Sequence, residues 1–453
     1  MPYLFYSLLL AAGMLLSTPY WIFQMLRHGK YRRGFSERMG RVPARLISNE
    51  NSRHQSRLQQ CRVIWVHAVS LGEVLAVSGL IEQMRNAFPD HRVVVTTTTD
   101  TGQAVARKRF GEENVFYFPM DFSFAIRPYL HALRPELVIL AETEFWPNFL
   151  REVHASGARI AVVNARISDR SWPSYLRFRW ALRRMLAHVD LFLAQTPQDA
   201  TRLQSIGAPA ERVHITGNLK FDATLPDAPP IVEKLRMALH DSSTGPVLVC
   251  GSTVEDEELL LLKAFENVLA AHPRAVMILA PRHPERFADV AALLQKSGIE
   301  WTRRSRWDSG DPSESLAGRA FLLDTIGELA ALYALADIAF VGGSLVPRGG
   351  HNIIEPAQHG VAIVVGEHTE NFRDIVSLFR NHDAVRIVTP KDLAPTFLHL
   401  LNNDVERNQL GRRAAEVLQS QTGATQRTLD ALQSLLAGSQ DVISVAAQAA
   451  HNH

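Results

Sequence analysis

VIWVHAVSLGEVLAVSGLIEQMR, residues 63–85, joins an apolar run to a glycine-containing turn and then to an amphipathic segment. The run at 63–66 is typical of a buried parallel strand, and the segment at 73–86 is typical of a helix that covers a sheet. A strand, a turn and a helix in this order make up most of a βαβ unit. The stretch therefore predicts an α/β fold with a parallel sheet.

The same alternation of apolar runs and helical patterns continues along the chain in two series. The runs of the first series lie at 63–66, 92–95, 137–141, 159–163 and 191–194. Those of the second lie at 247–250, 276–280, 320–323, 338–341 and 362–365. Two Rossmann-like, doubly wound α/β domains are expected, and ligands in such sheets bind beyond the carboxyl ends of the strands.

The domain boundaries follow from breaks in this pattern. The proline-rich run LPDAPP at 225–230 disfavours both helix and strand, so a linker is predicted over 225–245. One domain is expected at 27–224 and a second at 246–436. The weakly patterned residues 437–453 are expected to form a frayed tail.

Composition excludes several classes of protein. The 453 residues carry 48 Lys and Arg against 46 Asp and Glu, a net charge of +2 that is far from the basicity of a nucleic-acid-binding protein. The two cysteines, Cys61 and Cys250, form no disulfide framework and no CxxC pair, which fits a reducing compartment. The 18 histidines form no recognisable ligand motif, so the sequence predicts no metal site.

The N-terminus predicts a membrane anchor over residues 1–26. Residues 3–26 carry no charge, and a helix of that length can cross a hydrocarbon layer of ~30 Å. Residues 27–62 hold ten basic and two acidic side chains, which favours a cytoplasmic location for everything downstream and contact with anionic lipids. A long buried helix and, because of Pro19, a helix lying in the membrane interface remain alternatives.

Acidic side chains follow two of the first-series strands. Glu73 lies in the first helical turn behind Gly72, where it can act as a general base toward a sugar hydroxyl or simply as a helix-start acid. Glu142 and Glu144 directly follow another strand. Glu142 is favoured as the functional one, and the alternative is that one of the two caps the helix beginning near Pro147.

Basic side chains complete the first half. Lys220 follows a Gly-Asn turn, where it can balance a carboxylate or a phosphate on a donor. Residues 164–184 interleave six arginines with Trp172, Tyr175, Phe178 and Trp180. Such a stretch can bind single-stranded nucleic acid, membrane headgroups or only solvent, and the predicted anchor favours the membrane.

The second half carries a candidate nucleotide site. Arg282 and His283 follow a strand between two prolines, and a later strand runs into Gly342-Gly343-Ser344, Gly349-Gly350 and a helix expected from about Asn352. Glycines let backbone N–H groups approach a phosphate, and Glu355 can accept hydrogen bonds from ribose hydroxyls. The stretch is neither a Walker loop nor a GxGxxG fingerprint, and a purely structural turn stays open.

Seven motifs occur in an order that resembles one family. HAVSLGEVLA, TTTTDTG, ETEFWPN, NARISDRS, GNLKFD, APRHPERF and GGSLVPRGGHNIIEPA, spread over residues 1–425 with the anchor, resemble the bacterial 3-deoxy-D-manno-octulosonic acid (Kdo) transferases. The resemblance implies a GT-B fold with the active site in the cleft between an acceptor-binding domain, 27–224, and a nucleotide-binding domain, 246–436. It implies an inverting transfer from CMP-Kdo to lipid IVA, without metal or other cofactor, at the cytoplasmic face of the inner membrane.

The resemblance also assigns roles to residues. Glu73 is implied as the proton acceptor, and Glu142 and Lys220 as groups that assist at the transition state. The nucleotide is implied to be held by Pro281, Arg282, Ile326, Gly327, Glu328, Asn352, Ile353, Ile354 and Glu355. Two departures from the family pattern, at 48–60 and 302–318, are expected to leave these sites undisturbed, but the first could alter how the acceptor docks.

Three other functions remain open on the sequence alone. One is a GT-B glycosyltransferase that uses a UDP-sugar, and another is a noncatalytic, membrane-tethered nucleotide-binding protein. The third, nucleic-acid binding through residues 164–184, is disfavoured by the balanced charge. No motif sets how many Kdo residues are added.

Overall fold

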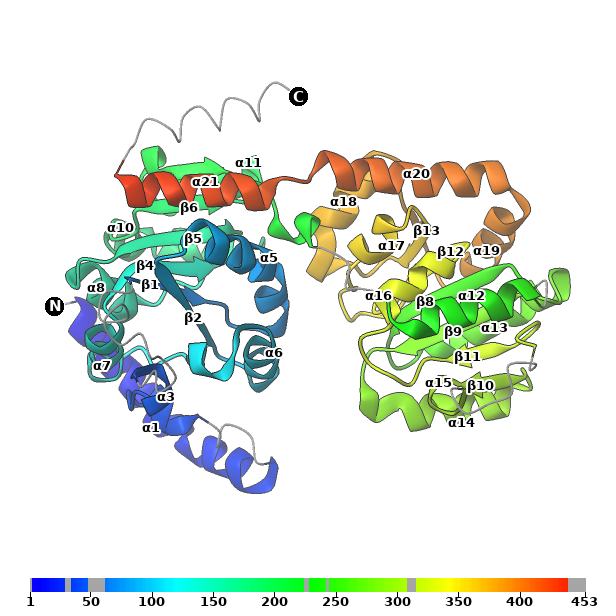
Figure 1. The fold of residues 1–453 in the computed structure, drawn as a ribbon, viewed down its shortest axis with the longest axis horizontal. Coiled ribbons are helices and arrows are strands. Elements are labelled where there is room, and N and C mark those ends of the chain that lie inside the picture. The colour runs from blue at the N-terminus through cyan, green and yellow to red at the C-terminus, as the bar shows by residue number, and fades with distance from the viewer. Residues whose placement is uncertain are drawn as a thin grey trace. The chain divides into compact units, whose positions relative to one another are not determined.

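The structure is a computed structural model that describes residues 2–28, 34–47, 62–223, 228–241, 244–307 and 315–438. The chain forms two compact units. Unit 1 comprises Met1–Ala223 together with Thr422–His453, and unit 2 comprises Thr224–Gln421. Each unit is built around its own parallel sheet (Figure 1), so the predicted α/β class with two doubly wound sheets is confirmed.

Within the described residues, the sheet of unit 1 has seven strands in the order β3-β2-β1-β4-β5-β6-β7. They are β1 (Arg62–His67), β2 (His91–Thr97), β3 (Val115–Tyr117), β4 (Pro135–Ala141), β5 (Arg159–Ala165), β6 (Leu191–Ala194) and β7 (Val213–Ile215). All neighbours pair in parallel. The order reverses between β1 and β4, which is where open α/β sheets form their ligand crevice.

Helices cover both faces of this sheet. Trp65 on β1 points into a core built with α7 (Ser123–Leu133), α8 (Pro147–Ala155), α10 (Arg179–Leu186) and α11 (Pro197–Ser205). Its neighbours Ile64 and Val66 point to the other face, which is covered by α5 (Leu71–Ala87) and α6 (Asp100–Phe110). Burial on both faces explains why the strand sequences are continuously apolar.

The last described helix, α21 (Ala424–Ala437), belongs to unit 1, whereas α20 (Asp404–Ser420) ends unit 2. Leu429 and Leu432 of α21 pack into the core beneath α5, and the Asp222 carboxylate accepts hydrogen bonds from the N–H groups of Gly423 (2.7 Å) and Thr425. Figure 1 shows α21 in red beside the strands of unit 1. The prediction of one domain over 246–436 is therefore wrong at its end, because an amphipathic pattern does not specify which sheet the helix covers.

The sheet of unit 2, counted over the part of the chain that is described, has seven parallel strands in the order β10-β11-β9-β8-β12-β13-β14. They are β8 (Val247–Thr253), β9 (Val276–Pro281), β10 (Trp301–Arg303), β11 (Ala320–Leu322), β12 (Ile338–Val341), β13 (Ala362–Gly366) and β14 (Arg386–Val388). The order reverses between β8 and β12, so this pair flanks the second crevice.

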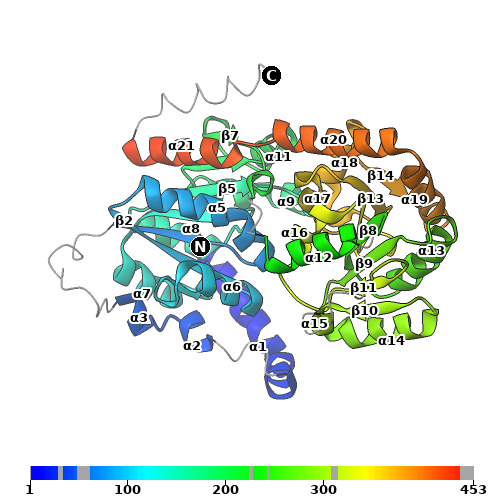
Figure 2. The ribbon, with the colours of Figure 1, turned by 45° about the vertical axis from the view of Figure 1, so that its right-hand side comes forward.

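Helices again lie on both faces, as Figure 2 shows. The helices α13 (Glu257–Ala271), α14 (Phe287–Ser297) and α19 (Leu393–Asn402) contribute to one core, and α12 (Pro230–Asp241) and α16 (Leu329–Leu332) contribute to the other. Ile231 and Leu235 of α12 are buried. The predicted linker at 225–245 is therefore wrong over 230–241, because a proline at the first position of a helix is tolerated.

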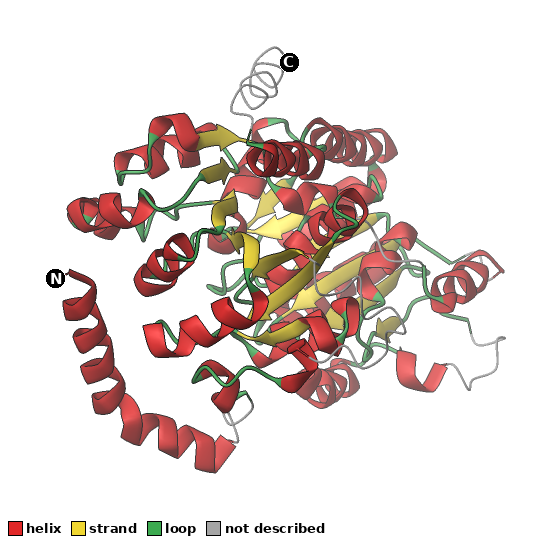
Figure 3. Cartoon of the chain, turned by 60° about the vertical axis from the view of Figure 1, so that its left-hand side comes forward, coloured by secondary structure: helices red, strands yellow, loops and turns green. Residues whose placement is uncertain are grey.

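The helix α1 (Pro2–His28) packs on unit 1 through one face. The Tyr3 hydroxyl lies 3.1 Å from Nε2 of His188, and the Asn148 side-chain amide donates to the Ser7 hydroxyl (3.0 Å). Leucines on the opposite face are exposed, with Leu16 at 84%. Figure 3 shows that α1, which contains Pro19, is bent. Among the described helices, none is both long and apolar enough to span a bilayer. The membrane anchor at 1–26 stays a prediction.

Candidate active site

Glu73 is held at the start of α5 by reciprocal hydrogen bonds with Ser70. Ser70 is the N-cap residue; its hydroxyl accepts from the Glu73 N–H (3.4 Å) and donates to the Glu73 carboxylate (2.9 Å). The Val69 N–H donates to the other carboxylate oxygen (2.7 Å). The Glu73 carboxylate therefore does stabilise the start of the helix, which was the alternative to a catalytic role. Each of its oxygens still has a lone pair that can accept a hydrogen bond from a ligand.

The surroundings of Glu73 raise its pKa to about 7. Burial is the largest cause, and the negative charges of Glu142 and Glu144 add to it. The hydrogen bonds from Val69 and Ser70 oppose the shift because they stabilise the charged form. A carboxylate with a pKa near neutrality is suited to take a proton from a hydroxyl at physiological pH.

Glu142 follows β4 with a backbone φ of 59°, in the left-handed region that residues other than glycine rarely adopt. Its carboxylate lies 3.6 Å from Nζ of Lys220. Because β1 and β4 are neighbours, Glu73 and Glu142 lie at the same reversal of strand order. The three residues predicted in unit 1 are therefore brought together, by an ion pair and by electrostatic coupling.

Neither Glu142 nor Glu144 caps the following helix. The first turn of α8 is held by Asp121, whose carboxylate accepts from the N–H groups of Asn148 (3.1 Å) and Phe149 (2.7 Å). Burial and the charge of Glu142 raise the pKa of Glu144. The alternative that one of these glutamates caps α8 is therefore wrong. Both carboxylates belong to the acidic cluster around Glu73.

Asn164 is a residue of this half-site that the sequence interpretation passed over. It is the last residue but one of β5 and lies next to Glu142, whose N–H donates to the Val163 carbonyl, and it has a left-handed φ of 53°. Its buried side-chain oxygen accepts from the Leu219 N–H (3.0 Å), one residue before Lys220. Asparagine tolerates this backbone conformation, so the motif NARISDRS contained a signal that was not used.

In unit 2, Arg282, Asn352 and Glu355 converge at the carboxyl edge of the sheet. The Arg282 side chain is exposed, and the backbone N–H of Arg282 donates to the Thr253 carbonyl (2.9 Å). Burial raises the pKa of Glu355, whereas a hydrogen bond from Asn352 and the positive charge of Arg282 act in the opposite direction. These three predicted residues therefore form one polar group.

The remaining predicted nucleotide-binding residues have different surroundings. The side chains of Pro281, Ile353 and Ile354 are buried in the interior, so they can offer a ligand only their backbone. Ile326 is 74% exposed, and Gly327 next to it has a φ of 91°.

The Glu328 carboxylate is already paired with the Arg304 guanidinium at 2.8 and 3.0 Å. Arg304 lies in the stretch 302–318. Part of this stretch therefore contacts a predicted nucleotide-binding residue, and its having no effect on the site stays a prediction.

The glycine-rich turn after β12 does not offer its amides to a phosphate. The N–H groups of Gly343, Ser344 and Leu345 donate to the buried carboxylate of Glu257, at 2.6, 2.8 and 2.8 Å. The helix that follows, α17 (Ile354–Gln358), begins two residues later than expected and has five residues. The predicted phosphate cradle is thus wrong for these three amides, because an internal carboxylate occupies it.

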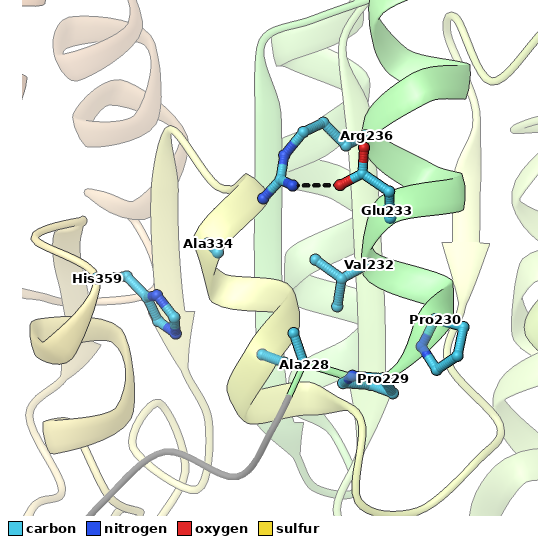
Figure 4. Close-up of a pocket in the computed structure, with 9 residues that line it drawn as sticks. Ala228, Pro229, Pro230, Val232, Glu233, Arg236, Ala334 and His359 are labelled. Atoms are coloured by element: carbon cyan, nitrogen blue, oxygen red, sulfur yellow. Dashed lines mark hydrogen bonds and ion pairs between the residues drawn. The ribbon is translucent and has the colours of Figure 1, made fainter.

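Unit 2 also has a cavity of about 220 Å³ between α12 and the segment around Ala334, shown in Figure 4. Its two charged residues, Glu233 and Arg236, pair with each other at 2.5 Å, and the rest of the lining is mostly apolar. Neither feature suits a nucleotide phosphate, and the cavity includes none of the predicted nucleotide-binding residues. Across the described ranges, no group of three or more His, Cys, Asp or Glu side chains is placed to hold a metal ion.

Comparison with known proteins identifies the family. The family model described as 3-deoxy-D-manno-octulosonic-acid transferase matches residues 33–223. Curated 3-deoxy-D-manno-octulosonic acid transferases from Haemophilus influenzae and Bordetella pertussis are 35% identical over 377 residues and 38% identical over 387 residues. Each alignment covers 82% of this chain and 87% of the relative.

A solved structure supports the fold independently. The UDP-GlcNAc 2-epimerase from Neisseria meningitidis, at 13% sequence identity, has a TM-score of 0.53 and covers 82% of this chain and 99% of its own. At that identity the likeness concerns the GT-B-like fold alone. The two transferases, by contrast, share more than a third of their residues with this chain over 82% of its length. The chain therefore belongs to the 3-deoxy-D-manno-octulosonic acid transferase family.

Proposed function

We propose that this enzyme transfers Kdo from CMP-Kdo to lipid IVA in the synthesis of the lipopolysaccharide core. Membership of the family supports Kdo transfer. The observation that carries the mechanism is Glu73, a carboxylate with a pKa of about 7 beside the Glu142–Lys220 ion pair.

In the proposed reaction a hydroxyl oxygen of the acceptor attacks the anomeric carbon of Kdo. The bond from that carbon to the phosphate oxygen of CMP breaks, and CMP departs with the electron pair. The hydroxyl proton passes to Glu73, which is recharged by losing it to solvent. One displacement of this kind inverts the anomeric configuration.

The roles of the other predicted residues follow from charge. Arg282, which is exposed beside Asn352 and Glu355, would attract the phosphate of the donor, and the backbone of Ile326–Glu328 would border the nucleotide. Lys220 would offset the charge of Glu142 and support the negative charge that the donor carries. These assignments rest on the positions of the residues within each unit.

The direct test is mass spectrometry of lipid IVA after incubation with the full chain and CMP-Kdo. We expect a mass increase of one or more Kdo residues, which also gives the number added. Parallel incubations with UDP-sugars test the alternative donor class. Transfer from a UDP-sugar with none from CMP-Kdo would contradict the proposal, and transfer from neither would favour a noncatalytic protein.

Arg282→Ala is expected to raise the KM for CMP-Kdo about tenfold, because a side-chain hydrogen bond or ion pair to a charged group contributes about 1.5 kcal/mol. Steady-state kinetics with varied donor at saturating acceptor measure this. The matched control is Arg236→Ala, since Arg236 pairs with Glu233 at the separate cavity. Equal donor KM values in the Arg282 variant and the unmodified enzyme would remove Arg282 from the donor site.

We further propose that the enzyme works at the cytoplasmic face of the inner membrane, held there by interfacial contacts. Support comes from the exposed leucine face of α1 and from Phe178 and Trp180, which are 55% and 65% exposed. The arginines at 177, 179, 183 and 184 around these two rings are also exposed. Aromatic and basic side chains together are typical of contact with anionic lipid headgroups.

The double substitution Phe178→Ser and Trp180→Ser is expected to weaken binding to phosphatidylglycerol vesicles at least tenfold, because each ring would lose roughly 1.5 kcal/mol or more of apolar transfer. Vesicle co-sedimentation of the full chain measures the change. Met237→Ser, which removes a side chain that is 52% exposed in unit 2, should leave binding unchanged. Undiminished binding of the double variant would exclude this surface.

A further inference from the structure

Two consecutive acids, Glu257 and Glu258, lie in the first turn of α13 directly after β8, and both are fully buried. A buried charge is costly unless hydrogen bonds or an opposite charge compensate it. Each of these carboxylates is compensated by a loop at the carboxyl edge of the unit 2 sheet. The sequence showed them only as ordinary acids at the start of a helix.

Glu257 organises the turn that follows β12. One carboxylate oxygen accepts from the N–H groups of Ser344 and Leu345, and the other accepts from Gly343 and from Val254, the latter at 3.2 Å. A Cβ atom at Gly342 would lie 2.8 Å from this carboxylate and 2.6 Å from a backbone oxygen, so only glycine fits there. The carboxylate therefore bridges β8 and β12, the pair at which the strand order reverses.

The turn at 343–345, which Glu257 holds, also positions the segment that leads to Asn352. The Gly350 N–H donates to the Gly343 carbonyl (2.7 Å), and Nδ1 of His351 lies 2.8 Å from the Gly342 carbonyl. A displacement of the turn would therefore be passed on to Asn352 and Glu355. The contacts form a continuous path from Glu257 to the proposed nucleotide site.

Glu258 fixes the loop that follows β9. One of its oxygens accepts from Nη1 of Arg286 (2.8 Å) and from the Thr253 hydroxyl (3.1 Å), and the other lies 3.3 Å from Nη2 of Arg286. Arg286 ends the short helix η4 (Pro284–Arg286), which begins two residues after Arg282. The Thr253 carbonyl also accepts a hydrogen bond from the backbone N–H of Arg282.

We propose that Glu257 and Glu258 are positioning residues for the donor nucleotide. Glu257 sets the segment that carries Asn352 and Glu355, and Glu258 sets the loop that carries Arg282. The inference rests on the proposed function, since it assumes that these loops bind CMP-Kdo. It also means that the donor phosphate is held by groups other than the amides of Gly343, Ser344 and Leu345.

Glu257→Gln tests the proposal with little change in side-chain volume. The new NH₂ group would face two N–H donors, so two of the four backbone hydrogen bonds to this side chain would be lost, at least one of them from the turn at 343–345. We expect the KM for CMP-Kdo to rise about tenfold, kcat to change less than threefold, and CMP affinity measured by calorimetry to fall about tenfold. Amide hydrogen exchange should accelerate at 343–345 and at 350–352.

Glu266→Gln is the matched control, because Glu266 is an exposed acid on the same helix. It should leave all four quantities unchanged. If Glu257→Gln does not fold, Glu258→Gln serves as a second variant. Its amide hydrogen exchange should accelerate at 284–286, and its KM for CMP-Kdo should also rise about tenfold. A normal donor KM and CMP affinity in whichever of the two variants folds, with accelerated exchange, would overturn the proposal and leave a structural role only.

Failure of the proposed function would look different. If the unmodified chain transfers no Kdo yet CMP affinity falls in the variants, the positioning role stands and the assigned reaction does not. If the unmodified chain transfers Kdo and the variants keep normal donor KM, the reaction stands and the positioning role does not.

Discussion

Glu73→Gln is expected to lower kcat by roughly 10²–10⁴-fold, the usual contribution of a positioned general base. Glutamine has almost the same shape, but its amide cannot take the hydroxyl proton. CMP affinity should stay within about twofold of the unmodified value, because Glu73 lies in unit 1 and the proposed nucleotide-binding residues lie in unit 2. Single-turnover kinetics with saturating CMP-Kdo and lipid IVA measure the rate.

The control for this variant is Glu82→Gln. Glu82 lies on the same helix, its side chain is 62% exposed, and its carboxylate lies 4.0 Å from the Arg109 guanidinium. We expect normal turnover there. A Glu73→Gln enzyme with more than a tenth of normal kcat would show that another group takes the proton.

The pH dependence gives a second readout of the same group. Since only the charged carboxylate is a base, kcat/KM should fall about tenfold per pH unit below the Glu73 pKa of about 7 and level off above it. In the Gln variant this acidic limb should disappear. Persistence of the limb would assign it to a different group.

The raised pKa also has a consequence for stability. Glu73 binds its proton more tightly in the folded chain than in the unfolded chain, whose pKa is near 4.5. Unfolding is therefore favoured progressively as pH rises from about 4.5 to 7, and the destabilisation is constant above 7. Glu73→Gln should make the chain more stable than the unmodified one at pH 8, by roughly 1–2 kcal/mol, with little difference at pH 4. Urea unfolding at the two pH values measures this.

The sequence was most informative where function coincides with strand ends. Glu73 and Glu142 each follow an apolar run, and the reversal of strand order between β1 and β4 makes those two strand ends neighbours. Arg282 and Glu355 were found in the same way. The rule works because side chains beyond the carboxyl ends of parallel strands have no structural partner in the sheet.

The sequence was least informative where a side chain acts through a distant backbone. Glu257 reaches the turn at 343–345, some 86 residues away, and nothing in its local sequence differs from an ordinary first-turn acid. Arg304 lies in the stretch 302–318, and nothing in that stretch predicts its pairing with Glu328. Asparagine at position 164 is compatible with a left-handed backbone, but its contact with Leu219 cannot be deduced from the sequence. Tertiary partners of this kind cannot be deduced from spacing.

Lys220→Met is expected to reduce kcat by roughly 10²–10³-fold, the range seen when one electrostatic stabiliser of a transition state is removed. The change would also leave Glu142 without the cation 3.6 Å away. Since the charge of Glu142 already raises the pKa of Glu73, the acidic limb of kcat/KM should move to higher pH. Lys220→Arg keeps the charge and should retain more activity than Lys220→Met, although guanidinium geometry differs.

The double variant Lys220→Met with Glu142→Gln separates the two effects of the lysine. Removing both charges relieves the repulsion on Glu73, so the acidic limb should return to near pH 7 or below. If Lys220 also stabilises charge on the donor, kcat at high pH stays low in the double variant, because no cation replaces it. Recovery of both the limb and kcat would mean that Lys220 serves only to neutralise Glu142. A Lys220→Met enzyme within threefold of normal kcat, with its limb unmoved, would place the ion pair outside the reaction.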